Sequence, residues 1–91
     1  MTNQTTESDN AINFTLGYRL QWEAAQDCHV LLYPEGMIKL NPAASEILNL
    51  VDGARNTEDI IKALEDKFPD ADLAEDVHEF IAVAKNNRWI E

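Results

Sequence analysis

The sequence has little cysteine and little glycine, and each scarcity excludes a class of site. Cys28 is the only cysteine among 91 residues, so the chain can form no disulfide of its own and no zinc site built from several thiolates. The glycines Gly17, Gly36 and Gly53 are too dispersed for a glycine-rich phosphate-binding loop. No apolar run approaches the roughly 20 residues needed to cross a bilayer, and the N-terminus lacks the layout of a secretory signal. We therefore expect a cytoplasmic protein.

Basic side chains are also scarce. Seven Lys and Arg stand against 17 Asp and Glu, which gives a net charge of −10 and a sequence pI near 4.4. Because nucleic-acid affinity comes largely from Lys and Arg that neutralise phosphates, this balance argues against binding to DNA, RNA or anionic membranes. It favours neutral or basic peptides and proteins as partners, with an affinity that falls as salt rises.

Side chains that could perform catalysis are few and poorly placed. Cys28 and His29 are consecutive in a predicted strand, so they point to opposite faces and make a poor dyad. His78 has no second histidine at the helical spacing of a zinc site. The acidic cluster over residues 70–79 lacks the ligand pattern of an EF-hand and is explained by helix capping and solubility. We predict no catalytic residue, no metal site and no bound cofactor.

The first residues differ in character from the rest of the chain. Residues 1–13 are mostly polar and show no periodic pattern. Such a segment has little apolar surface to bury against the entropy of ordering it. We expect residues 1–13 to form a disordered arm ahead of a single domain that spans residues 14–91.

The domain begins with three predicted strands. Tyr18, Leu20 and Trp22 alternate with polar residues, as in a half-buried strand. Residues 28–33 are apolar enough for a central strand. A Pro-Glu-Gly turn leads into a short third strand over residues 37–40. Short links between the strands predict an antiparallel sheet.

Helical spacing follows the strands. Asn41 as N-cap and Pro42 at the first position predict a helix that ends at Gly53. Thr57 is predicted to cap a second helix, which Pro69 stops. The buried stripe of this second helix is predicted to comprise Ile60, Ile61, Leu64 and Phe68.

A third helix completes the domain. Asp72 with Glu75 three residues later resembles a capping box. The main apolar stripe of the helix is Leu73, Val77, Phe80, Ile81 and Ala84. Three strands followed by three helices predict an α+β fold with the helices on one face of a small antiparallel sheet.

Two surface features point to binding of another chain. The third strand presents an unpaired edge, which is either protected by Lys39 or used to pair with an extended peptide. Such an edge also makes weak dimerisation plausible, so we expect a monomer or a weak homodimer. Val83, beside Phe80, is either a lone surface apolar residue or part of a groove wall.

Several segments together resemble the PqqD family, the small peptide-binding proteins of pyrroloquinoline quinone (PQQ) biosynthesis. The resemblance covers about Tyr18 to Glu91, and its most specific part is Val30-Leu31-Leu32-Tyr33-Pro34-Glu35-Gly36. The other matching segments are Tyr18-Arg19-Leu20-Gln21-Trp22-Glu23, Leu40-Asn41, Ile47-Leu48, Asp52-Gly53 and Trp89-Ile90.

The resemblance implies a winged helix-turn-helix-like peptide-recognition domain. In that family the leader of a precursor peptide, here PqqA-like, lies along the third strand in a groove floored by the third helix. The peptide is presented to a PqqE-like radical SAM enzyme, which carries the iron–sulfur clusters and SAM. The strand side would be Met37, Ile38, Lys39 and Leu40. The helix side would be Val77, Phe80, Ile81, Val83 and Ala84, with the division between groove and core left open.

Two alternatives remain open from the sequence. The chain could be a recognition element of another pathway that modifies ribosomal peptides. It could also be a winged-helix DNA-binding protein, although the charge disfavours this because the third helix opens with Asp72, Glu75, Asp76 and Glu79.

Overall fold

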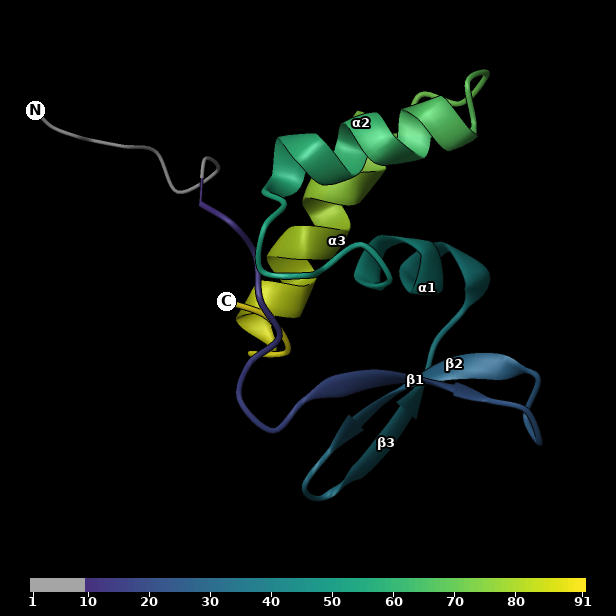
Figure 1. Ribbon diagram of the computed structural model, residues 1–91, viewed down its shortest axis with the longest axis vertical. Coiled ribbons are helices and arrows are strands. Elements are labelled where there is room, and N and C mark those ends of the chain that lie inside the picture. Colours follow the sequence, from purple (N-terminus) through teal and green to yellow (C-terminus); the bar gives the residue numbers. More distant parts are fainter. Residues whose placement is uncertain (1–9) are drawn as a thin grey trace, which may run out of the picture.

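A computed structural model describes residues 10–91, which form three strands followed by three helices (Figure 1). The predicted α+β order is confirmed. Residues 1–9, which make up most of the predicted arm, lie outside the described residues. The elements are β1 (Arg19–Glu23), β2 (Cys28–Tyr33), β3 (Gly36–Lys39), α1 (Pro42–Leu48), α2 (Thr57–Lys67) and α3 (Ala74–Asn86).

The sheet has the strand order β1-β2-β3, and both pairs are antiparallel. Leu31 is the central member of a cross-strand row that also contains Leu20 and Ile38, and all three pack in or against the hydrophobic core. Because successive strand residues point to opposite faces, neighbouring rows point away from this core. The helices all lie on one side of the sheet (Figure 1).

The helix ends correct several predicted boundaries. The N–H of Ala44 donates to Oδ1 of Asn41 (2.8 Å), which confirms Asn41 as the N-cap of α1, but α1 ends at Leu48 and not at Gly53. The N-cap of α2 is Asn56, and the predicted cap Thr57 lies inside the helix and is buried.

The capping box of this protein lies at the start of α2. The N–H of Asp59 donates to Oδ1 of Asn56 (2.9 Å), and the N–H of Asn56 donates to Oδ2 of Asp59 (3.1 Å). The capping box predicted from Asp72 and Glu75 is wrong, because Leu73 occupies the N-cap of α3 and makes no side-chain cap bond.

The core lies between the sheet and the helices. Its largest fully buried side chains are Ile12, Leu31, Leu48, Ile60, Val77 and Ile90, whereas Val30 is fully buried outside this core cluster. Phe68, which was predicted to be on the buried stripe of α2, is the C-cap residue that follows Lys67, and it is 40% exposed. Among residues 10–91, no helix is both long and apolar enough to span a membrane.

Residues 10–13 belong to the folded body, although they were assigned to the arm. Ile12 is 1% exposed, and its backbone is fixed between the N–H of Gly53 and the C=O of Arg55. Asn13 and Glu91 exchange two backbone hydrogen bonds, at 2.9 and 2.8 Å. Gly53 has a φ of +80°, and a Cβ there would lie 2.5 Å from Oδ1 of Asn13, so glycine suits this close approach.

Candidate functional site

The outer edge of β3 is open within the described chain. The N–H of Leu40 donates to the C=O of His29 (3.0 Å), which fixes the hydrogen-bonding alternation of the β2–β3 pair. In an antiparallel pair every second residue bonds to its partner strand, so the N–H and C=O of Ile38 face Leu31. The N–H and C=O groups of Met37 and Lys39 therefore face outward.

The side chains of the predicted strand site divide between the two faces. Met37 is 48% exposed and Lys39 is exposed, and both lie on the face without helices. Ile38 is half-buried against the core, and Leu40 is a core residue at 7% exposure. A chain arriving at this edge would therefore meet Met37, Ile38 and Lys39 rather than Leu40.

Burial also sorts the predicted residues of α3, a division that the sequence left open. Val77, Ile81 and Ala84 are 2%, 4% and 0% exposed and belong to the core. Val83 is 48% exposed, and Phe80 is half-buried, with its ring centroid 6.5 Å from that of Trp89. Like Ile38, Phe80 packs against the margin of the core cluster.

The open edge of β3 is not part of a cavity. One apolar pocket of about 540 Å³ lies among α1, α2 and the start of α3, and a second of about 340 Å³ lies between the sheet and α1. Neither is lined by Met37, Ile38, Lys39, Phe80 or Val83.

The apolar pocket is lined by Pro42, Ala43, Glu46, Ile47, Leu64, Phe68, Ala71, Leu73, Asp76 and Val77. Sequence reasoning missed it because Phe68 and Leu73 were both assigned to buried stripes.

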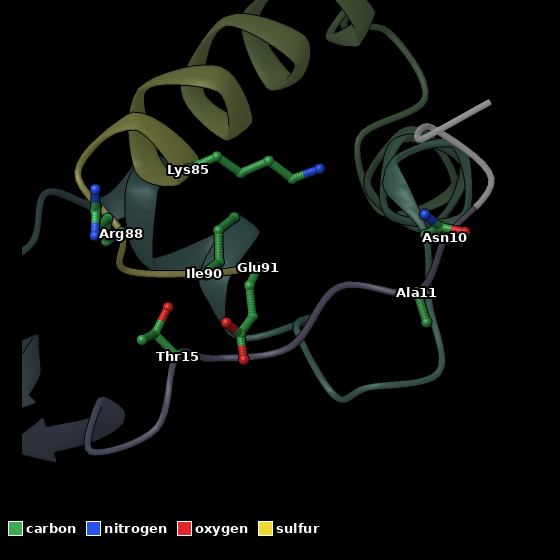
Figure 2. A pocket seen from close by; sticks show the side chains of 7 residues that line it. All are labelled: Asn10, Ala11, Thr15, Lys85, Arg88, Ile90 and Glu91. Atoms are coloured by element: carbon green, nitrogen blue, oxygen red, sulfur yellow. The ribbon is translucent and has the colours of Figure 1, made fainter.

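A third pocket, of about 500 Å³, lies where the two ends of the described chain meet (Figure 2). Its lining is mixed polar and apolar and comprises Asn10, Ala11, Thr15, Lys85, Arg88, Ile90 and Glu91. The side chains of Lys85 and Arg88 point in different directions and do not converge (Figure 2). This pocket therefore does not present a focused site for a charged ligand.

Both histidines of the described chain contact neighbouring side chains. His29 contacts Trp22 edge to face, with 5.1 Å between centroids, and His78 Nε2 lies 3.3 Å from Glu58 Oε2 at the exposed surface between α3 and α2. Within residues 10–91 there is no group of three His, Cys, Asp or Glu placed to hold a metal ion.

The pKa of the Asp52 carboxyl is lowered in the folded protein. Backbone N–H groups of Ala54 (2.9 Å) and Arg55 (3.0 Å) donate to its Oδ1 and lower its pKa, and the Arg55 guanidinium, 2.9 Å from Oδ2, lowers it further. These bonds order the loop between α1 and α2, which also holds Ile12. The role of Asp52 is therefore to shape this loop.

Comparisons with known proteins identify the family of this chain. The family model described as Coenzyme PQQ synthesis protein D (PqqD) matches residues 28–90. The "PqqA binding protein" of Azotobacter vinelandii is 57% identical over 76 residues, covering 82% of this chain and 83% of the relative. The "PqqA binding protein" of Klebsiella pneumoniae strain 342 is 51% identical over 85 residues, covering 92% of each chain.

A solved structure shares the fold. It is the solution NMR structure of the PqqD truncation of Methylobacterium extorquens PqqCD, described as a functional, stand-alone recognition element for ribosomally synthesized and post-translationally modified peptides. It is 28% identical to this chain, with a TM-score of 0.74, and the match covers 96% of this chain and 95% of that one. The predicted winged-helix-like recognition fold is thereby confirmed.

Proposed function

The chain belongs to the PqqD family, and on that premise we propose that it binds the precursor peptide PqqA in PQQ biosynthesis. It is a binding protein and not an enzyme, in keeping with relatives that are named for binding PqqA. We further propose that it presents the bound peptide to a PqqE-like radical SAM enzyme, to which the iron–sulfur clusters and SAM belong.

The observation that supports peptide binding most directly is the open edge of β3. Met37 and Lys39 each turn an N–H and a C=O outward, so an extended guest chain can add to the sheet as a fourth strand through these groups. The guest would lie along Met37, Ile38 and Lys39. We propose that Phe80 and Val83 of α3 provide the apolar contacts.

Energetics explain why such apolar contacts are needed. A hydrogen bond contributes about 0.5–1.5 kcal/mol net, so four bonds at this edge give about 2–6 kcal/mol. Ordering about four guest residues costs about 1–2 kcal/mol each, or about 4–8 kcal/mol. Backbone pairing alone therefore does not hold the guest, and burial of a few apolar side chains must supply the affinity. A carrier with this balance can be selective and still release its cargo.

The test is a titration of isotope-labelled protein with the PqqA-like precursor peptide, following backbone amide shifts. We expect large changes at Met37, Ile38 and Lys39 and at Phe80 and Val83, because these residues would contact the guest. The matched control is the same peptide with proline placed in the pairing segment, which removes N–H donors. Changes confined to β1, or no changes at all, would contradict the proposed site.

A weak homodimer through the same edge is also part of the proposal. A second copy could pair with β3 when no guest is present, but a charge of −10 on each copy opposes association. We expect sedimentation measurements to give mostly monomer, with more dimer at high salt and less when peptide is added.

A further inference from the structure

The face of the sheet that points away from the helices is a second exposed surface. We call it the outer sheet face. All three helices lie on the opposite side (Figure 1). By the strand alternation, its residues are Arg19, Gln21, Glu23, Cys28, Val30, Leu32, Met37 and Lys39.

Apolar side chains occupy the middle of the outer sheet face. Leu32 lies between Arg19 and Met37 in one cross-strand row, and Val30 lies between Gln21 and Lys39 in the next. Val30 is 0% exposed but does not belong to the core cluster beneath the helices. Leu32 is half-buried and Met37 is 48% exposed. The accessible apolar surface of this face is therefore provided by Leu32 and Met37, whereas Val30 is covered.

The charge of the outer sheet face is opposite to that of the whole chain. It carries two cations, Arg19 and Lys39, and one carboxylate, Glu23, in a chain with a net charge of −10. Within the described chain neither cation forms an ion pair, which is also true of Lys62, Lys85 and Arg88, whereas Arg55 and Lys67 are paired with carboxylates at 2.9 and 2.8 Å. The free cations make this face complementary to an acidic surface.

We propose that the outer sheet face is a docking surface for an acidic surface of the enzyme that receives the peptide. This inference rests on the proposed function. A guest strand paired to β3 would extend the same sheet, and every second guest side chain would point to the outer face beside Met37 and Lys39. The enzyme would then contact carrier and cargo on one continuous surface and bind the loaded carrier more tightly.

A second copy of this chain fits the outer sheet face less well. In a two-fold dimer the same patch faces itself, which would bring the free cations Arg19 and Lys39 of both copies together. Nucleic acid is also a poor occupant, because the rest of the chain is strongly acidic.

The experiment compares charge reversals on opposite sides of the molecule. Arg19→Glu is made on β1, two strands from the peptide edge, and the matched control Lys62→Glu is made at an exposed position of α2. Both variants change the net charge by the same amount. Affinity for the purified PqqE-like enzyme is measured with and without peptide at two salt concentrations, and affinity for peptide is measured separately.

We expect Arg19→Glu to weaken enzyme binding by about three- to tenfold at low salt, with a smaller loss at high salt. Lys62→Glu should change the affinity for the enzyme by less than about twofold. Arg19→Lys, which keeps the positive charge, should have the wild-type affinity. Peptide affinity should be the same in all three variants, because Arg19 lies far from the open edge in strand order.

Equal enzyme affinities for Arg19→Glu and Lys62→Glu, or an enzyme that does not bind the wild-type carrier, would overturn the docking surface. With peptide binding intact, equal affinities of the two variants would leave the proposed function in place, whereas a wild-type carrier that does not bind the enzyme would leave peptide binding and overturn the proposed presentation. Conversely, a wild-type carrier that binds the enzyme through Arg19 but does not bind peptide would support the docking surface and overturn the proposed function.

Discussion

Proline substitution along β3 tests the open edge residue by residue. The N–H of Lys39 points outward, whereas the N–H of Ile38 points to Leu31 in the sheet. Proline removes an N–H and is tolerated on an edge strand only where that N–H faces solvent. Lys39→Pro should therefore remove a bond to the guest, and Ile38→Pro should remove a bond of the protein itself.

The magnitudes separate the two variants. Loss of one hydrogen bond to the guest costs about 0.5–1.5 kcal/mol, which is about a 2- to 12-fold increase in the Kd for peptide. In Ile38→Pro the acceptor that loses its donor is the C=O of Leu31, a residue with 0% exposure. An orphaned buried acceptor costs about 1–3 kcal/mol of folding free energy, and the loss of the Ile38 side chain adds to this.

The assay combines calorimetric titration with the PqqA-like peptide and denaturant unfolding followed by circular dichroism. Lys39→Ala is the matched control, because it removes the side chain and keeps the N–H. We expect Lys39→Pro to bind more weakly than Lys39→Ala at similar stability, and Ile38→Pro to lose stability. A folded Lys39→Pro variant with the peptide affinity of Lys39→Ala would refute pairing at this edge.

Three further predictions concern the fold. Ile12→Ala should lower the free energy of unfolding by about 2–5 kcal/mol. The control Leu16→Ala, at a residue that is 94% exposed, should change the free energy of unfolding by less than about 0.5 kcal/mol. Equal losses of the two variants in denaturant unfolding would contradict the burial of Ile12. Asn56→Ala should cost about 0.5–2 kcal/mol through loss of the α2 cap, and an unchanged unfolding midpoint would argue against that cap. The folded state lowers the pKa of Asp52, so its carboxylate stabilises the protein at neutral pH and loses this effect as the pH falls through the folded-state pKa. The stability difference between wild type and Asp52→Asn should therefore shrink on acidification, and a gap that stays constant to about pH 2 would contradict this.

Much of the fold follows from patterns that are local in the sequence. Alternation and short links gave the three strands in the right order, and Asn41-Pro42 gave the start of α1. The strand order and register then place an open edge at residues 37–39. These features could be predicted because each depends on neighbouring residues.

The features that sequence reasoning missed depend on contacts between distant segments. Ile12 lies in a polar stretch of the sequence. It is buried because its backbone bonds to Gly53 and Arg55 and because the next residue, Asn13, pairs with Glu91 at the C-terminal end. The capping box was assigned to Asp72 and Glu75, although Asn56 and Asp59 form it, because both pairs have the same spacing. Periodicity placed Val77, Ile81 and Ala84 on one apolar stripe, but it could not tell whether they face the core or a groove, and their burial assigns all three to the core.

The contact between Phe80 and Trp89 gives the protein an optical reporter. The chain has only two tryptophans, and Trp22 lies on β1 beside His29 while Trp89 packs against the proposed peptide contact Phe80. Replacing Trp22 with phenylalanine would leave Trp89 as the one indole, and its emission maximum and intensity depend on the polarity of its surroundings at α3. Rapid-mixing fluorescence could then follow the arrival and departure of unlabelled cargo in real time.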